Sequence, residues 1–482
     1  MRANMTASNR RYTRFFIYLI FLHSLLSTAC QKKSETTDIK FDLPQIEARG
    51  SLVALTNYSA TSYFIYKGQP MGYEYELLTR LADHLHLRLE IQIENNLENM
   101  FNRLKNGSGD IIARSLTITR PRQEFLQFTE PLFDTRQVLV QHKPDNWRHL
   151  MLHQIEEKLI RNPIDLIGKD IYVLQGSAHL ARLQHLSDEI GGKINLIQVD
   201  GDTTSEQLIQ MVADGVINYT VSDDHVALIN QAYYQDIDVE TPLSLPQRIG
   251  WATRKSSPEL LQAINTWLEE IKKSAVLQVV YNKYFINRSA YIQRVESDYL
   301  SVTGGKISAY DKIIQKHAQE INWDWRLLAA LIYKESRFDP TAKSWTGATG
   351  LMQLLPAIGR EYGAQNLDDP RQNIKAGVRY LQWLEDYWVK YINDSDVRLK
   401  FILASYNVGI GHVEDARRLA EKYGRDPDRW DNNVAYYLLR LSDEKFFSQD
   451  VVEFGYCRGI EPYKYVEGIL NIYSQYQKLV TT

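Results

Sequence analysis

The spacing of apolar residues changes once along this chain, and the change predicts two different folds. From Gly50 to about residue 285, short apolar runs of strand length alternate with segments of helical spacing. Strands that alternate with helices predict an α/β domain built on a parallel sheet. After about residue 307 nearly all apolar residues follow a helical spacing, which predicts a mainly α-helical domain.

The α/β part contains two successive sets of strands and helices, over residues 45–145 and 146–240, and a return to the first set near 249–253. This order predicts a two-lobed domain over residues 45–288. A linker is expected at 289–305, where Thr303, Gly304 and Gly305 interrupt the apolar pattern, and the helical domain at 306–482. The expected strands and helix lie at 52–55, 89–93, 110–113 and 171–174, and at 76–86.

The first 29 residues have the pattern of a secretory signal. Four arginines precede an apolar run from Phe15 to Leu26, which is shorter than the about 20 residues that span a membrane. Small residues then lead to Cys30, so we expect a lipid on Cys30 and a tether over 30–44. Leu26 lies one place early for a typical lipidation motif. Ordinary cleavage that leaves Cys30 as a free thiol is therefore the alternative.

Composition and charge exclude several classes of protein. The hydrophobic content of 44% and charged content of 24% are those of a soluble globular chain. A net charge of −3 provides no basic field for nucleic acid. Two cysteines cannot form a disulfide framework, and neither part shows a metal or phosphate-binding motif. We therefore expect no cofactor and no metal, and we expect Cys457 to be a small buried residue.

A glutamate on an apolar helix face is the strongest candidate for chemistry. At helical spacing, Glu335 shares a face with Leu328 and Leu331. Burial disfavours the charged carboxylate, so the pKa of Glu335 should rise toward neutral, as a general acid for a glycosidic bond requires. A single glutamate in the last turn of a helix more often reaches solvent, so this residue alone does not establish a site.

Three further motifs follow Glu335-Ser336 in order. They are Gly350-Leu351-Met352-Gln353, Ala404-Ser405-Tyr406-Asn407-Val408-Gly409 and Tyr465-Val466. Together, over about 180 residues, they resemble the soluble lytic transglycosylase family. The resemblance implies a mainly α, lysozyme-like fold and the glycan strands of peptidoglycan as substrate.

The same resemblance implies the roles of single residues. Glu335 matches the catalytic acid, which protonates the oxygen between N-acetylmuramic acid (MurNAc) and N-acetylglucosamine (GlcNAc) and then accepts the proton of the muramic C6 hydroxyl, giving a 1,6-anhydro product. Tyr465 matches a tyrosine whose hydroxyl reaches that acid. The expected substrate contacts are Ser336, Met352, Gln353, Tyr406, Asn407 and Tyr465. For each of them, simple packing or backbone bonding is the alternative.

A hydrolase would need a second carboxylate at about 5–9.5 Å from the acid. Asp339 precedes Pro340 and is typical of a turn that ends a helix, and Asp368 and Asp369 lie in another turn, before Pro370. Neither turn offers a convincing partner. This favours transglycosylation, with a hydrolytic muramidase as the alternative.

The α/β part resembles family 3 extracellular solute-binding proteins over about residues 45–285. The motifs are Gly68-Gln-Pro-Met-Gly72-Tyr73-Glu74, Thr119-Arg120-Pro121-Arg122, Gly176-Ser177 and Val221-Ser222-Asp223. The resemblance implies that Arg122 grips a ligand carboxylate, Asp223 receives its amine and Ser177 contacts it from the second lobe. Arg120 and Asp224 are competing candidates, and a scaffold that binds no ligand is the alternative.

The complete expectation is a multidomain chain with an N-terminal α/β two-lobed periplasmic-binding-protein-like domain and a C-terminal mainly α lysozyme-like domain. It would cleave peptidoglycan glycan strands under regulation by an amino-acid or muropeptide effector. Gln31 after Cys30 resembles a sorting signal for the outer membrane, so we expect the periplasmic face of its inner leaflet in a Gram-negative envelope. A non-catalytic solute-binding or wall-binding envelope protein is a further alternative.

Overall fold

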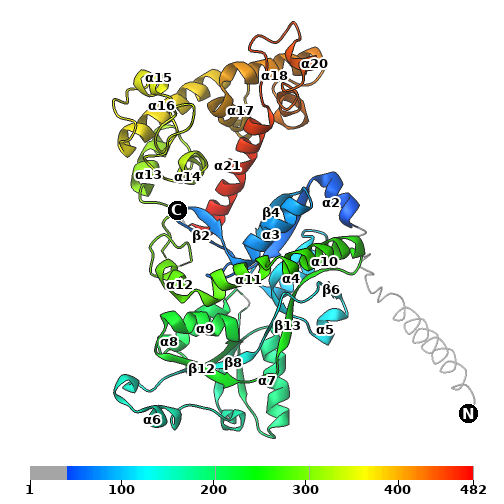
Figure 1. The fold of residues 1–482 in the computed structure, drawn as a ribbon, viewed down its shortest axis with the longest axis vertical. Coiled ribbons are helices and arrows are strands. Elements are labelled where there is room, and N and C mark those ends of the chain that lie inside the picture. The colour runs from blue at the N-terminus through cyan, green and yellow to red at the C-terminus, as the bar shows by residue number, and fades with distance from the viewer. Residues whose placement is uncertain (1–40, 201, 303, 481–482) are drawn as a thin grey trace, which may run out of the picture.

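The computed structural model describes residues 41–200, 202–302 and 304–480, and it divides into the two expected parts (Figure 1). The predicted signal peptide and Cys30 lie outside the described residues. No helix within the described part of the chain combines the length and apolar character needed to cross a membrane.

The first lobe is built on a mixed sheet in the order β4-β1-β5-β13-β6, with β7 paired to β13. β1 runs parallel to β4 and β5, whereas β13 is antiparallel to its neighbours. Helices α3, α4 and α10 pack their apolar faces against it. The bounds are β1 Ser51–Thr56, β4 Arg88–Ile93, β5 Ile111–Thr117, β6 Leu126–Phe128, β7 Phe133–Thr135, β13 Gln247–Arg254, α3 Tyr73–His84, α4 Leu97–Lys105, α5 Arg120–Gln123 and α10 Pro258–Lys273.

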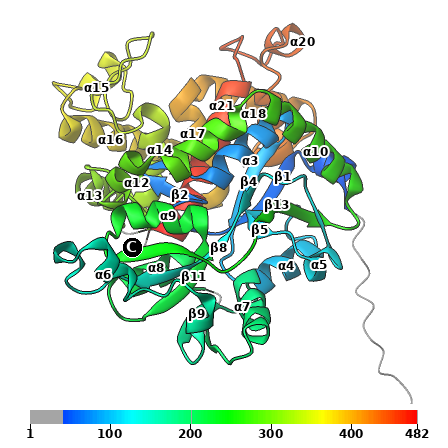
Figure 2. The ribbon, with the colours of Figure 1, turned by 60° about the horizontal axis from the view of Figure 1, so that its bottom comes forward.

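The second lobe, which contains β8, β9 and β11 in Figure 2, has its own sheet. Its five strands lie in the order β10-β9-β11-β8-β12. β9 is parallel to β10 and β11, and β8 is antiparallel to β11 and β12. The bounds are β8 Gln137–His142, β9 Asp170–Leu174, β10 Asn195–Val199, β11 Tyr219–Asp223, β12 Ile237–Pro242, α6 Leu152–Glu156, α7 Ala178–Glu189, α8 Ser205–Ala213 and α9 Asp224–Tyr233, with short 3₁₀ turns at Trp147–His149 and Pro163–Leu166.

The strands and the helix expected from the sequence are present, but two expectations are corrected. Both sheets are mixed and not parallel, because β13 and β8 enter them in the opposite direction. The first lobe was expected to extend to residue 145, yet β8 pairs within the second sheet, so the chain changes lobes near Arg136. An apolar run shows that a strand forms, and it does not show which sheet the strand joins.

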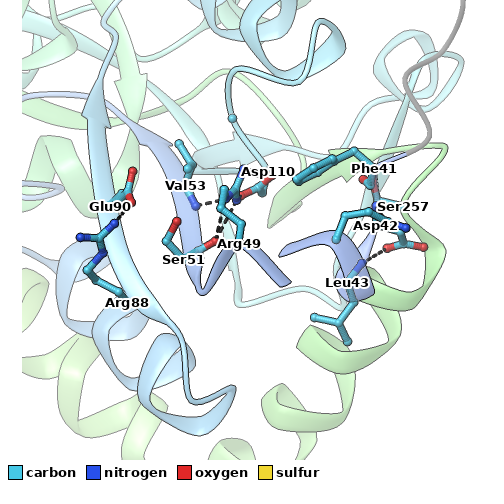
Figure 3. Close-up of polar contacts among 12 residues, drawn as sticks. Phe41, Asp42, Leu43, Arg49, Ser51, Val53, Arg88, Glu90, Asp110 and Ser257 are labelled. Atoms are coloured by element: carbon cyan, nitrogen blue, oxygen red, sulfur yellow. Dashed lines mark hydrogen bonds and ion pairs between the residues drawn. The ribbon is translucent and has the colours of Figure 1, made fainter. Parts of the chain in front are cut away.

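The first described residues are fixed to the first lobe (Figure 3). Asp42 caps α2 (Leu43–Arg49) by accepting a hydrogen bond from the Leu43 backbone N–H at 2.9 Å. Its carboxylate also accepts from the N–H of Leu260 at 2.9 Å, and the Ser257 hydroxyl donates to the Phe41 carbonyl at 2.9 Å. The end of the predicted tether, residues 41–44, is therefore part of this lobe.

A buried aspartate connects α2 to the sheet. Asp110 is fully buried and accepts a hydrogen bond from the Val53 N–H of β1 at 2.8 Å (Figure 3). Its carboxylate pairs with Arg49 at the end of α2 and, at 3.4 Å, with Arg254 of β13. Because its charge is paired with two arginines, the Asp110 carboxylate can be buried in the interior of the lobe.

The C-terminal domain is helical, as predicted, and it is built around its last helix. α14 and α17 pack against α21, and α16 packs against α17. The bounds are α13 Asp311–Glu320, α14 Trp325–Ser336, α15 Pro356–Glu361, α16 Pro370–Trp388, α17 Ser395–Val408, α18 Ile410–Lys422, α19 Ala435–Leu438, α20 Glu444–Phe447 and α21 Ile460–Leu479, with a π-helical turn at Trp430–Val434.

The segment between the domains packs on the first of them. After α11 (Val276–Tyr281) and a π-helical turn at Asn282–Ile286, α12 (Arg288–Val295) occupies the start of the predicted linker. The Tyr291 hydroxyl of α12 donates to Asn230 of the second lobe at 2.9 Å. Ser301 then forms backbone and side-chain hydrogen bonds with Ile65, at 2.9 and 2.8 Å. The linker is thus structured.

A small hairpin joins the two domains. β2 (Phe64–Tyr66) and β3 (Gln69–Met71) are connected by Lys67 and Gly68, which both have positive φ angles, 50° and 75°. Helix α21 reaches this turn from the helical domain (Figure 1), and the Tyr476 hydroxyl donates to the Gly68 carbonyl at 2.6 Å. The Phe338 ring packs on Gly68, and one continuous buried apolar cluster extends through both domains.

Replacing Gly68 by alanine should weaken this interface. A Cβ atom there would overlap the Phe338 ring and approach the Tyr476 hydroxyl to 3.0 Å. The positive φ angle alone costs roughly 1–2 kcal/mol for a residue with a side chain. Gly50→Ala is the matched control, because Gly50 also has a φ of 75° but nothing lies near its Cβ position. We expect Gly68→Ala to lower the free energy of unfolding in urea more than Gly50→Ala. Equal losses would contradict a tight contact.

Candidate functional site

Glu335 lies in the last turn of α14, on the face that the sequence predicted. Leu328 and Leu331 of that face are fully buried, and Glu335 itself is half-buried. The Tyr465 hydroxyl, on α21, donates a hydrogen bond to the Glu335 Oε1 at 2.5 Å. Burial raises the pKa of the Glu335 carboxyl to about 7, although the Tyr465 hydrogen bond and the Lys334 charge act in the opposite direction. The group can therefore both donate and accept a proton near neutral pH.

Ser336 connects the end of α14 to the glycine-rich loop. Its hydroxyl lies 2.8 Å from the Leu351 carbonyl and 3.2 Å from the Ile332 carbonyl, and its side chain is buried. The chain then leaves the helix through Arg337 and Phe338, both with positive φ angles. In this structure the hydroxyl therefore fixes the loop beside the acid, which is the backbone-bonding alternative.

The loop that carries Met352 and Gln353 is held in place by the side-chain amide of Gln353. The Gln353 amide donates to the carbonyls of Ala342 and Gly350 at 3.0 and 2.9 Å. The Met352 side chain is fully buried, and its sulfur packs against Gly377 of α16. This is the packing role that the sequence left open for Met352.

Asn373 is a positioning residue that sequence reasoning missed. It is fully buried on α16, and its amide donates to the carbonyls of Thr349 and Leu367, each at 2.9 Å. Its carbonyl oxygen accepts from the Met352 N–H at 2.8 Å. The only signal in the sequence is a polar residue directly before the apolar stripe of the helix.

Two tyrosines from distant motifs meet at the acid. The Tyr406 hydroxyl, near the end of α17, donates to the Met352 carbonyl at 2.7 Å. Burial, followed by the charge of Glu335, raises the pKa of the hydroxyls of Tyr406 and Tyr465 well above the usual range. Asn407 follows Tyr406 and is exposed. The four sequence motifs thus come together around a single carboxyl.

The other aspartates considered from the sequence have turn or capping roles. Asp339 is exposed and accepts hydrogen bonds from the Thr341 N–H and hydroxyl, at 2.8 and 2.7 Å, and these bonds lower its pKa. Asp369 caps α16 by accepting from the Arg371 N–H at 2.8 Å. Among the described residues, no carboxylate contributes to the pKa shift of Glu335.

A second site lies between the two lobes of the N-terminal domain. Arg122, Ser177 and Asp223, which the sequence suggested as ligand contacts, all line one cavity. The two competing candidates do not line it: Arg120 is exposed, and Asp224 accepts a hydrogen bond from the Thr135 hydroxyl at 2.7 Å. Of the competing candidates, Arg122 and Asp223 therefore face the cavity, and Arg120 and Asp224 do not.

The charged groups of this cavity are incompletely paired. The Arg122 guanidinium is buried and donates to the carbonyls of Thr117 at 3.0 Å and Gly176 at 3.5 Å, and burial lowers its pKa to about 10. Among the described residues, no group donates a hydrogen bond to the Asp223 Oδ1, and the His179 Nε2 lies 3.4 Å from it. Ser177 caps α7 by accepting from the Leu180 N–H at 3.2 Å.

Two more charged residues line the cavity and were missed. Arg114 of β5 donates to the Asn95 carbonyl at 2.7 Å, and Glu206 of α8 accepts from the Thr61 hydroxyl at 3.0 Å. The hydrogen bond between Thr61 and Glu206 joins the two lobes. Arg114 interrupts an apolar strand, which is a usable signal, whereas Glu206 looks like an ordinary residue of the first turn of a helix.

One further expectation concerns the thiol of the helical domain. Cys457 is buried and free, as predicted, and burial raises the pKa of its thiol to about 11. Within residues 41–200, 202–302 and 304–480, no three His, Cys, Asp or Glu side chains are grouped as metal ligands.

Comparison with known families matches both domains. Residues 52–287 match the family described as bacterial extracellular solute-binding proteins, family 3, and residues 312–428 match the transglycosylase SLT domain. Among solved structures, a mutant of the arginine-binding protein from T. maritima is 25% identical, with a TM-score of 0.43, and covers 51% of this chain and 99% of its own. An ancestral arginine-binding protein bound to arginine has a TM-score of 0.41 at 25% identity, with coverages of 49% and 99%.

Two curated relatives match nearly the whole chain. The membrane-bound lytic murein transglycosylase F of Desulfosudis oleivorans is 36% identical over 435 residues, which are 89% of this chain and 90% of that protein. The protein of the same name from Pseudomonas fluorescens is 31% identical over 472 residues, 97% of this chain and 91% of its own length. The chain therefore belongs to the membrane-bound lytic murein transglycosylase F family, whose members are peptidoglycan lytic transglycosylases.

Proposed function

We propose that the helical domain cleaves the β-1,4 bond between MurNAc and GlcNAc without water, leaving 1,6-anhydro-MurNAc ends. The observation that carries this proposal is the Glu335 carboxyl, which accepts a hydrogen bond from the Tyr465 hydroxyl at 2.5 Å and whose pKa is raised by burial to about 7. Hydrolysis by paired carboxylates needs a second group at about 5–9.5 Å. The aspartates nearest in sequence cap helices or turns instead.

One carboxyl serves both steps because the nucleophile belongs to the substrate. Glu335 donates its proton to the bridging oxygen as the bond between that oxygen and the muramic C1 breaks. The resulting carboxylate accepts the proton of the C6 hydroxyl as the C6 oxygen bonds to C1. The hydrogen bond from Tyr465 stabilises this carboxylate and holds its orientation. Acid and base are restored in one cycle with no net proton change.

The other residues of the site would position the glycan. Tyr406 offers a ring beside the acid, and Asn407, which follows it, offers an exposed amide, a natural partner for an N-acetyl group. Ser336, Gln353 and Met352 act through the loop, because their polar groups bond backbone atoms and the methionine side chain is buried. We therefore assign sugar contact to Tyr406 and Asn407, and positioning to Ser336, Met352 and Gln353.

Glu335→Gln should remove activity and retain the fold. The amide cannot donate the required proton, so we expect the rate of glycan cleavage to fall by about 10²–10⁴-fold. Mass spectrometry of products released from purified sacculi measures both rate and chemistry, since a hydrolytic product is heavier than the anhydro product by one water. Asp339→Asn is the control and should keep activity. Reducing ends from the wild-type protein, or activity in Glu335→Gln, would contradict the proposal.

Activity should fall as pH rises through about 7. Catalysis begins from protonated Glu335, and the pKa of this group is raised to about 7, so the competent form is lost above that value. The Tyr465 hydrogen bond lowers this pKa. Tyr465→Phe should therefore move the falling limb of kcat/KM to higher pH while reducing kcat. Tyr463→Phe, on the same helix, should leave the profile unchanged, and a limb that moves to lower pH in Tyr465→Phe would refute this assignment.

We propose further that the N-terminal module binds an amino acid or a muropeptide. A buried charge that is incompletely paired is unfavourable, and a zwitterionic ligand would complete the pairing of both charged groups here. Its carboxylate would pair with Arg122, its amine with Asp223, and Ser177 would contact it from the second lobe. The charged groups on both sides of the cavity argue against a scaffold that has lost its ligand.

Binding would regulate cleavage through the hairpin. Thr61 and Ser62 line the cavity and are separated from β2 by one residue. The other end of the hairpin contacts Phe338, three residues beyond Glu335. A ligand can shift the enzyme between two states only if it binds them with different affinities. We place the protein, through a lipid on Cys30, at the inner leaflet of the outer membrane on its periplasmic face, because of its predicted signal sequence.

Arg122→Ala should abolish ligand binding, whereas Arg120→Ala should not. Arg122 faces the cavity and Arg120 is exposed two residues away, so the pair differs only in placement. Isothermal titration with a panel of free amino acids and a purified muropeptide measures the affinity, which we expect to fall at least tenfold in Arg122→Ala. Equal affinities would exclude this site. Equal rates of glycan cleavage with and without the bound ligand would exclude regulation.

A further inference from the structure

One face of α16 carries a row of aromatic rings that the proposed chemistry does not use. Tyr380, Trp383 and Tyr387 lie on this helix and Tyr391 lies just beyond its end, at spacings of three and four residues. The ring centroids are separated by 5.9 Å, 6.2 Å and 5.6 Å in this order. We call these four residues the aromatic track.

The aromatic track begins at the active site. The Tyr380 ring lies 5.4 Å from the ring of Tyr406, whose hydroxyl is close enough to Glu335 for the carboxyl to raise its pKa. Tyr391 lies eleven positions after Tyr380, a separation that corresponds to about 16 Å along a helix. The rings therefore lead from the acid along the surface of the domain.

Two rings of the track, Trp383 and Tyr391, do not fill the core. Trp383 is 43% exposed and Tyr391 is 46% exposed in the complete chain, although other residues of α16, including Leu381, Leu384 and Trp388, are buried. A surface row of large aromatic side chains is typical of an interaction site. The two exposed rings are thus available to a partner.

Polar groups are fixed beside the far end of the aromatic track. The Tyr387 hydroxyl donates to Glu414 at 3.0 Å, and the Arg417 guanidinium lies over the Tyr391 ring at 4.6 Å. Arg417 is itself held by hydrogen bonds to Glu414 and Asp428. Aromatic faces flanked by ordered hydrogen-bonding groups match a ligand that has both C–H faces and hydroxyl or amide groups.

We propose that the aromatic track binds the glycan strand beyond the sugars held at Glu335, and so extends the substrate site along α16. This inference rests on the proposed cleavage of glycan strands. A linear polymer of pyranose rings offers repeated apolar faces along one direction, as the rings of the track do. The occupant is the continuous strand, because the track starts at Tyr380, whose ring centroid lies 5.4 Å from that of Tyr406 at the proposed cleavage site. The track would make affinity depend on strand length.

The test compares long and short substrates. With peptide-free glycan strands, the double variant Trp383→Ala/Tyr391→Ala should raise KM about tenfold with little change in kcat, because two stacking surfaces are lost. With a MurNAc–GlcNAc tetrasaccharide, which leaves few sugars beyond those held at Glu335, the rise in KM should be much smaller than with long strands. The control is Tyr456→Ala, which removes an exposed ring elsewhere on the domain. Trp383→Phe should restore part of the affinity for long strands.

The remaining outcomes separate this inference from the proposed function. Unchanged KM on long strands in the double variant overturns the aromatic track while cleavage by the wild type stands. Failure of the wild type to cleave either substrate overturns the proposed function instead. A defect seen only with strands that carry stem peptides would identify a peptide as the occupant and refute glycan binding. An equal loss on both substrates, with a lower unfolding midpoint, would show that the rings serve packing alone.

Discussion

The hydrogen bond between Tyr465 and Glu335 is the contact on which the rest of the helical domain depends. It joins α21 to α14 at 2.5 Å, and both helices bury apolar faces around it. A carboxyl that was simply buried would remain protonated and could not return to the base form during turnover. A carboxyl open to water would be ionised before reaction. Burial and one donated hydrogen bond together place its pKa near 7, between these two limits.

The same helix connects this carboxyl to the binding module. Tyr465 is near the start of α21 and Tyr476 near its end, where the latter contacts Gly68 of the hairpin. Arg88 of the first lobe also pairs with Glu467, between these two tyrosines. A chain of packed elements therefore extends from the cavity between the lobes to the acid. The buried cluster shared by both domains makes them one mechanical unit, so the separation into two family matches does not imply two independent bodies.

The sequence predicted the two folds, the position of Glu335 and the residues that surround it, because each depends on local spacing or on a recognisable motif. It could not predict which sheet β8 joins, since an apolar run such as Val138-Leu139, which is buried in the second lobe, does not specify the lobe that buries it. It also could not predict Asn373 or Glu206. Their roles come from hydrogen bonds to residues that are distant in sequence, Met352 and Thr61. Ser336 was recognised, but its partner, the Leu351 carbonyl, could be identified only in three dimensions.

The length of α21 between its two functional tyrosines cannot vary. Tyr465 must face Glu335 while Tyr476 faces the hairpin, and the helix has no interruption between them. Inserting or deleting one residue would rotate one end relative to the other by about 100° and displace it by about 1.5 Å. Either the hydrogen bond from Tyr465 to Glu335 or the one from Tyr476 to the Gly68 carbonyl would then be lost. Natural variation in this segment should therefore consist of substitutions, and length changes should be confined to the loops on the opposite side of the domain.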